Sequence, residues 1–117
     1  MIAVILTAAV ALLHLCFMYL EMIAWTRPLG RRVFGTTAEF AGASKALAAN
    51  QGLYNGFLVA GLLWGLYLGP DGFAIRAFFL GCVVVAGLFG AATVSRRILY
   101  VQALPAVAAL IALLAGW

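Results

Sequence analysis

Four long apolar segments, separated by short polar connections, constrain this chain more than any other feature of its sequence. They cover roughly residues 2–25, 43–68, 73–94 and 98–117. Each segment can cross a bilayer as a helix, because about 20 mainly apolar residues span the hydrocarbon core. Only 9% of the residues are charged, and the mean hydropathy is +1.18. The sequence therefore predicts an integral membrane protein with a single transmembrane domain over residues 1–117.

The connections between these segments are short, so neighbouring helices are expected to be antiparallel. The predicted fold is all-α, an antiparallel four-helix bundle in the membrane. Only the first connection, about residues 26–42, is long enough for structure of its own, and we expect a short surface helix around residues 37–41. A cleavable signal peptide is the competing interpretation of the first segment. It is disfavoured because the apolar stretch is too long and carries both His14 and Glu21.

The basic residues predict the orientation of the bundle. Six of the seven lie on the first and third connections or at their ends, and these two connections lie on the same side of the membrane. By the positive-inside rule that side is the cytoplasm, which leaves both termini outside. The positive charges are better explained as orientation signals than as a nucleic-acid surface, since no groove-reading element accompanies them. The six residues are Arg27, Arg31, Arg32, Lys45, Arg96 and Arg97.

Polar side chains gather at one depth of the predicted bundle. Asparagine and glutamine are expensive in hydrocarbon, yet three amides and a tyrosine enter the second segment within six residues. Glu21 lies about 6 Å below the same boundary, at 1.5 Å of rise per residue. We therefore expect a polar pocket in the cytoplasmic third of the bundle, with Arg96 at its mouth. Its expected residues are Glu21, Asn50, Gln51, Tyr54, Asn55, Arg97, Tyr100 and Gln102.

His14 is a candidate second binding residue of this polar site, deeper in the membrane than Glu21. It lies seven residues before Glu21, so the two side chains share a helix face and His14 is about 10 Å deeper. A carboxyl group in hydrocarbon is expected to be protonated or paired, and the candidate partners of Glu21 are Arg96, Arg97 and the amides of Asn50 and Asn55. The alternative is that His14 and Glu21 only join helices and bind no ligand.

Glycines recur at four-residue spacing in two groups along the second segment and just after it. They are Gly52 and Gly56, and then Gly61, Gly65 and Gly69, and this spacing is typical of closely packed membrane helices. The chain is also small, at 12.3 kDa. Together these features predict a homo-oligomer.

Cys16 and Cys82 each fall within an apolar run, and neither has a second cysteine or a histidine at metal-ligand spacing. We expect both to be buried small hydrophobic residues. The sequence predicts no metal site, and no cofactor motif is evident.

Three groups of residues resemble a known family. They are His14, Glu21 and Trp25 in the first segment, Asn50-Gln51-Gly-x-Tyr54-Asn55-Gly56-Phe57-Leu58 in the second, and Gln102-x-x-Pro105-Ala106 in the fourth. This pattern resembles the small four-span bacterial membrane family catalogued as domain of unknown function 1304. The likeness covers essentially the whole chain, and it implies a multi-pass protein of the bacterial inner membrane.

A more distant resemblance concerns Lys45-x4-Asn50-x3-Tyr54-Asn55 and Arg97-x2-Tyr100-x-Gln102-x2-Pro105. The types and spacing of these residues resemble those of the membrane-associated proteins in eicosanoid and glutathione metabolism, which typically form trimers of four-span subunits. This resemblance implies a glutathione-like thiol as ligand, bound by Asn50, Tyr54, Arg96, Arg97 and Tyr100, with Arg97 stabilising a thiolate or carboxylate. The chain departs from that pattern, because Tyr54 stands where a glutamate is expected and Lys45 or Ala46 where an arginine is expected.

Three functions are compatible with these features. In the first, the cytoplasm-facing pocket binds, or binds and modifies, a small amphiphilic molecule whose head meets Glu21, Asn50, Asn55 and Arg97. In the second, the chain is a small oligomeric proton-coupled transporter that uses His14 and Glu21. In the third, it is a structural helper of another membrane protein. The outer half of the bundle is nearly free of polar groups, which favours a one-sided pocket.

Overall fold

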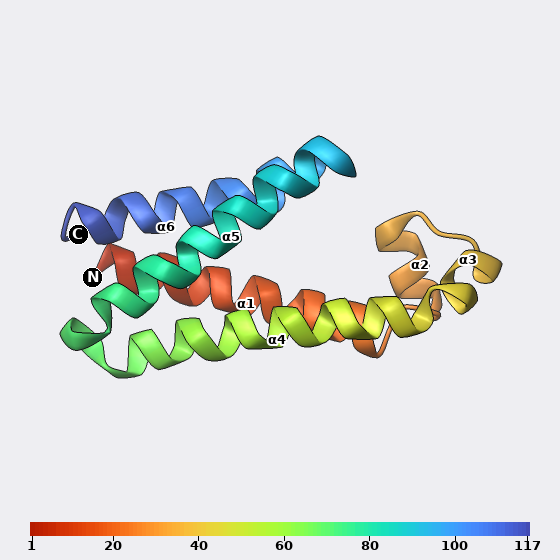
Figure 1. The fold of residues 1–117 in the computed structure, drawn as a ribbon, viewed down its shortest axis with the longest axis horizontal. Helices are drawn as coiled ribbons and strands as arrows, with labels where there is room; N and C mark the ends of the chain where they lie inside the picture. The colour runs from red at the N-terminus through yellow and green to blue at the C-terminus, as the bar shows by residue number, and fades with distance from the viewer. The chain divides into compact units, whose positions relative to one another are not determined.

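The computed structural model describes residues 1–117 and consists of helices and their connections, without strands (Figure 1). The prediction of an all-α fold is confirmed. The chain forms two compact units, which we describe in turn. Unit 1 comprises Met1–Leu12 and Ala60–Trp117, and unit 2 comprises Leu13–Val59. Two helices, α1 (Ile2–Met22) and α4 (Lys45–Tyr67), contribute residues to both units.

Unit 1 contains an antiparallel hairpin of α5 (Phe73–Thr93) and α6 (Leu104–Leu114), which lie side by side in Figure 1. Gly87 lies against the backbone of Ala103, and Gly90 lies against Ile98. As residue numbers rise along α5, those of the contacting residues therefore fall, as expected for a helical hairpin. A Cβ atom on Gly87 would lie 2.8 Å from the Ala103 nitrogen, so glycine is what permits this close approach.

A tight corner joins α4 to α5 within unit 1. The 3-10 turn η1 (Gly69–Gly72) begins at Gly69, whose φ of +59° suits glycine. Arg76, on the first turn of α5, is buried, and its Nη2 donates a hydrogen bond of 3.0 Å to the Gly69 carbonyl oxygen. Gly65 leaves room for the Arg76 side chain, since a Cβ atom there would lie 2.6 Å from Arg76 Cγ. The guanidinium thus satisfies a carbonyl group just beyond the end of α4.

The two ends of the chain lie together in unit 1 (Figure 1). The backbone N–H of Ala3 donates a hydrogen bond of 3.0 Å to the carbonyl oxygen of Trp117. The core of this unit includes Leu62, Leu80 and Val83, none of which is exposed.

A π-helix, η2 (Leu99–Ala103), precedes α6. Its cause is Pro105, at the start of α6, because proline has no N–H to donate to the carbonyl four residues earlier and its ring clashes with that carbonyl. The apolar pattern predicts one regular helix over residues 98–117, and the structure differs from that prediction at η2. The proline inside an apolar helical run was the signal for the distortion.

Unit 2 contains the second half of α1 and the first half of α4, packed antiparallel. Met18 lies against Gly56, and Met22 and Glu21 lie against Gly52. The glycines of α4 therefore allow close helix packing, as their spacing indicated. Gly61 and Gly65 likewise meet Phe79 and Arg76 of α5 in unit 1, so four of the five spaced glycines pack against other helices of the same chain.

Two short helices fold within the first connection of unit 2. They are α2 (Pro28–Phe34) and α3 (Ala38–Ala43). The second of these overlaps the short helix expected around residues 37–41, and the Thr37 side chain caps it by accepting a hydrogen bond from the Phe40 N–H. The first was not predicted, although Pro28 at its start and Gly35 in a left-handed conformation after its end are typical boundary signals.

Two helices are long and apolar enough to cross a membrane, α1 and the stretch Gly69–Thr93. Three amides, at positions 50, 51 and 55, lower the hydropathy of α4, although it has 23 residues. The remaining apolar stretch, Leu99–Leu114, is shorter. The complete four-helix membrane bundle therefore stays a prediction.

The environment of the cysteines differs from the expectation. Cys16 is exposed and Cys82 is half-buried, whereas the sequence predicted two buried side chains. Cys16 lies on the face of α1 that also exposes Leu12 and Tyr19. An apolar run predicts that a side chain avoids water, but it does not decide whether protein or lipid surrounds that side chain.

Candidate functional site

Glu21 and Asn55 form the centre of the polar site in unit 2. Asn55 Nδ2 donates a hydrogen bond of 3.0 Å to Glu21 Oε1, and both residues are half-buried. The same amide lies 3.4 Å from the Gln51 carbonyl oxygen. Of the partners that the sequence predicted for Glu21, the structure thus shows Asn55 bonded to it. A hydrogen bond to a carboxyl group holds both side chains in place, and it leaves Glu21 Oε2 and Asn55 Oδ1 for other partners.

The close approach of α1 and α4 makes this hydrogen bond possible. A Cβ atom on Gly52 would lie 3.1 Å from Glu21 Cβ and 3.2 Å from the Met18 carbonyl oxygen. Asparagine has a short side chain, so Asn55 reaches Glu21 only because the two backbones are near each other. Gly52 and Met18 therefore help to build the site, although the sequence did not predict them as site residues. The four-residue spacing of the glycines was the available signal.

The other predicted residues of α4 lie on the exposed surface of that helix. Asn50, Gln51 and Tyr54 are exposed, and the Tyr54 ring lies 6.1 Å from that of Phe57. The sequence placed these side chains over a wide arc of the helix, and in the structure only Asn55 of the four contacts Glu21. Three polar groups therefore remain on the surface of unit 2 beside the Glu21–Asn55 pair.

His14 lies on α1, two turns from Glu21. Its side chain is completely buried, and its ring meets that of Phe17 edge-to-face, with 5.4 Å between the centroids. His14, which the sequence predicted as a second residue of the polar site, thus lies in the interior of the protein, whereas Glu21 is only half-buried.

The remaining candidates belong to unit 1. Arg97 and Tyr100 are exposed, and Gln102 is half-buried. The latter two lie within the π-helix η2, and the Arg97 N–H donates a hydrogen bond to Ser95 Oγ over 3.3 Å. π-Helical turns occur frequently at functional sites, because the wider turn redirects side chains. Whether these three residues act together with Glu21 stays a prediction.

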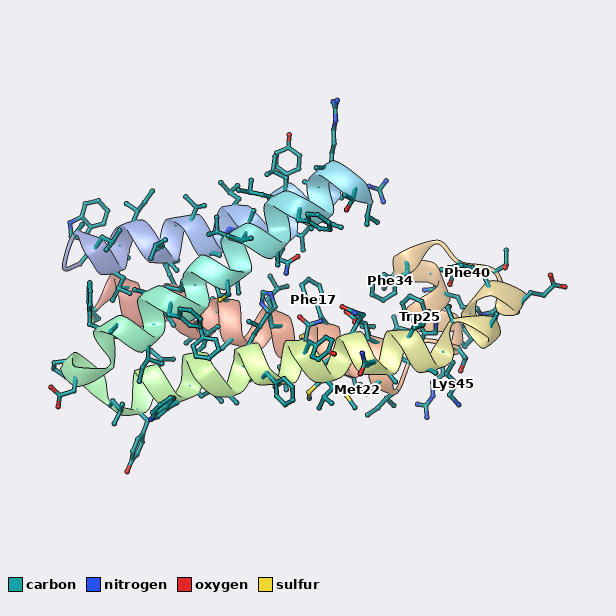
Figure 2. All side chains as sticks on the ribbon, viewed as in Figure 1. Phe17, Met22, Trp25, Phe34, Phe40 and Lys45 are labelled. Carbon is teal, nitrogen blue, oxygen red and sulfur yellow. The ribbon has the colours of Figure 1, made fainter.

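Trp25 connects the elements that follow Glu21 (Figure 2). Its indole Nε1 donates a hydrogen bond of 3.0 Å to Ser44 Oγ, and its ring lies 4.9 Å from that of Phe34 on α2. Ser44 directly precedes α4, so one side chain ties the end of α1 to α2 and to the start of α4. This arrangement fixes the entrance to the helix pair that carries Glu21 and Asn55.

The site offers hydrogen-bonding chemistry. It presents a carboxyl group, a carboxamide and further amides over a small area, and these groups suit a ligand that carries hydroxyl or ammonium donors. No three histidine, cysteine or acidic residues lie close enough together to hold a metal ion. Cys16 and Cys82 are free thiols.

The fold and the site together define a small all-α protein with strongly apolar helices and a carboxyl–amide pair between two of them. The chain belongs to the family described as protein of unknown function (DUF1304), whose model matches residues 8–114. It is similar to the uncharacterized protein YpaA of Lactococcus lactis subsp. lactis (strain IL1403), with 31% identity over 112 residues and 94% of each chain covered. No solved structure matches. The predicted family membership is thus confirmed.

Proposed function

We propose that this chain is a multi-pass inner-membrane protein that binds the polar head of a small amphiphilic molecule at the Glu21–Asn55 pair. The observation that carries the proposal is the 3.0 Å hydrogen bond between these side chains, half-buried between α1 and α4. A carboxyl group at the end of an apolar helix is expensive unless it has a partner or a function. Asn55 meets only one of the two carboxyl oxygens.

Membrane insertion is supported by how little of the apolar helices the chain itself covers. In α1 and in the stretch Gly69–Thr93, the most apolar windows have mean hydropathies of 2.3 and 2.1, yet only 28% of their residues are buried. A core helix of comparable apolarity in a soluble protein would be mostly buried. Large side chains such as Leu12, Val85 and Phe89 are 62%, 67% and 70% exposed. Lipid is the solvent that suits such surfaces.

The ligand class follows from the groups at the site. The available oxygens of Glu21 and Asn55 accept hydrogen bonds, so the head of the ligand should donate them, as a hydroxyl or an ammonium group does. The exposed apolar flanks of the helices suit an alkyl tail. Asn50, Gln51 and Tyr54 provide further polar contacts beside the pair, and the sequence adds Arg97, Tyr100 and Gln102 as candidates.

The test compares the small molecules that co-purify with the protein. Wild type and the variant Asn55→Leu are purified in a mild detergent, and their bound molecules are extracted and identified by mass spectrometry. We expect one class of amphiphile to be enriched in wild type and reduced at least about fivefold in Asn55→Leu, the equivalent of losing a hydrogen bond of about 1 kcal/mol.

Thr93→Val is the matched control for this comparison. It also removes a polar group from a helix, but Thr93 is exposed and only bonds the Phe89 carbonyl of its own helix. It should retain the wild-type set of molecules. Equal recovery of every class from Asn55→Leu and wild type would contradict binding at this pair.

Proton-coupled transport is the second candidate, and the complete burial of His14 favours it. A titratable imidazole inside an apolar helix, on the same face as Glu21, could relay a proton. If the protein is a proton-coupled transporter, a pH gradient should drive solute uptake into proteoliposomes that contain wild type. The variant His14→Gln should then show no such uptake. A pocket that only binds its ligand predicts equal ligand retention in wild type and His14→Gln, without any uptake.

A further inference from the structure

The segment that connects α1 to α4 in unit 2 has an amphipathic surface that none of the functions above uses. We call it the α2–α3 surface. It combines exposed apolar side chains, such as Phe34 and Phe40, with basic ones such as Lys45 (Figure 2). Its members are Arg27, Leu29, Arg31, Arg32, Val33, Phe34, Phe40 and Lys45.

The apolar part of this surface is turned outward by the packing of α2. Gly30 lies directly against the backbone of Ala24 and Trp25, so that side of α2 is fixed to the end of α1. Leu29 and Val33, four residues apart on another side of the helix, are 49% and 52% exposed. Phe40 on α3 is 57% exposed. Large apolar side chains in this number are unusual on a short polar connection in contact with water.

The basic side chains give the α2–α3 surface a positive charge. Four cationic side chains occur between positions 27 and 45, and Glu39 is the one acidic residue in that range. No carboxylate lies on α2, and its last turn carries Arg31 and Arg32. Long arginine side chains can extend towards phosphate groups while neighbouring apolar side chains lie deeper. This combination is typical of helices that lie in the plane of a membrane surface.

Two polar atoms of the same segment lack partners. Arg31 Nε and Thr36 Oγ1 are buried and make no hydrogen bond within the chain. Buried polar atoms are normally paired, with protein or with water. Their positions are linked through the backbone, because the Thr36 N–H donates a 3.0 Å hydrogen bond to the Arg31 carbonyl oxygen. An ordered water molecule would supply the acceptor that the buried Arg31 Nε lacks, which leaves the terminal guanidinium nitrogens for a phosphate group.

We propose that the α2–α3 surface binds anionic phospholipids of the cytoplasmic leaflet, with Leu29, Val33 and Phe40 in the acyl boundary and Arg31 and Arg32 on the phosphates. The proposal rests on membrane insertion as part of the proposed function, but not on the Glu21–Asn55 pair. A bilayer surface is favoured over a protein partner because Arg31 and Arg32 lie beside exposed apolar side chains on the same short helix, α2, and α3 adds the exposed Phe40, as an interface between headgroups and acyl chains requires.

The test measures lipid binding to the full chain in detergent. The midpoint of thermal unfolding is followed as phosphatidylglycerol or phosphatidylcholine is added, for wild type and Arg31→Gln/Arg32→Gln. We expect phosphatidylglycerol to raise the midpoint at lower concentrations than phosphatidylcholine does. The double variant should need about 25-fold more phosphatidylglycerol, which corresponds to about 1 kcal/mol for each arginine near an anionic surface.

Further variants separate charge from apolar contact. Arg31→Lys/Arg32→Lys keeps both charges and should stay within about threefold of wild type. Leu29→Gln/Val33→Gln replaces two exposed apolar side chains without changing the charge, and should lose the phosphatidylglycerol effect although both arginines remain. Soluble glycerol phosphate, which lacks acyl chains, should have no effect at the same concentrations.

Equal effects of the two lipids on wild type, or an unchanged response of Arg31→Gln/Arg32→Gln, would overturn the inference. Extraction with alkaline carbonate distinguishes failure of the proposed function from failure of this inference. A chain that alkaline carbonate extracts from membranes is not inserted, and both proposals then fail. A chain that stays in the membrane without any preference for anionic lipid overturns only the lipid-binding surface.

Discussion

At the scale of single residues, the site depends on one short side chain that meets one carboxyl group. The sequence placed Glu21 and the amides of α4 at one depth, and the hydrogen bond between Glu21 and Asn55 agrees with that placement. It could not distinguish Asn55 from Asn50, which is exposed. Depth follows from counting residues along a helix, whereas the side that faces a neighbour depends on where glycines allow that neighbour to approach.

The energetic link between Glu21 and Asn55 can be measured with a double-mutant cycle. Glu21→Leu and Asn55→Leu each leave one half-buried polar group without its partner and should each lower the free energy of unfolding by about 1 kcal/mol. The double variant should be destabilised by less than the sum, with a coupling of about 0.5–1.5 kcal/mol. Denaturation in mixed micelles provides the measurement. Strict additivity would show that the two side chains do not interact.

At the scale of helices, close packing is concentrated at a few glycines. Four apolar segments were predicted from hydropathy, and the long helices α1, α4 and α5 occur within three of them. Hydropathy did not reveal α2, since seven residues give too short a pattern, and it did not reveal the π-helix caused by Pro105. The glycine spacing predicted close helix packing, and most of those glycines pack within the chain, while the homo-oligomer stays a prediction.

Three Gly→Ala variants test this packing. A Cβ atom on Gly87 would meet the Ala103 backbone, which cannot move easily, so Gly87→Ala should lower the free energy of unfolding by about 1–3 kcal/mol. Gly56→Ala should be close to neutral, because it meets only the flexible Met18 side chain at 3.0 Å and gains helix propensity.

Gly81→Ala is the matched control on α5. No atom lies within 4 Å of its added Cβ, so it should raise the free energy of unfolding by about 0.5–1 kcal/mol through helix propensity alone. Thermal unfolding of the three variants in one detergent gives the ranking. If Gly87→Ala were as stable as Gly81→Ala, α5 and α6 could not pack as closely as described.

At the scale of the whole molecule, we expect an even number of membrane crossings. The hydrogen bond between Ala3 and Trp117 holds the two ends of the chain together, which requires both ends on one side of a membrane. The basic residues of the first and third connections predict that this side is outside the cytoplasm. Composition alone predicts apolar helices, and the distribution of charge adds their direction.

Accessibility of introduced cysteines tests this topology in intact cells. Asp71→Cys, on the exposed η1 turn, should react with a membrane-impermeant thiol reagent, whereas Thr37→Cys, on the first connection, should react only after the cells are opened. The parent variant for both should have Cys16 and Cys82 replaced by alanine. The reverse pattern would invert the orientation, and labelling of both positions in intact cells would argue against insertion.

The most direct test of the central claim is an experimental structure of the full chain in a lipid nanodisc at a resolution that shows bound lipids and water. We expect density for a non-protein head group within hydrogen-bonding distance of Glu21 Oε2 and Asn55 Oδ1, with an apolar tail along α1 or α4. A closed site, in which protein side chains cover both oxygens and no ligand density remains, would contradict it.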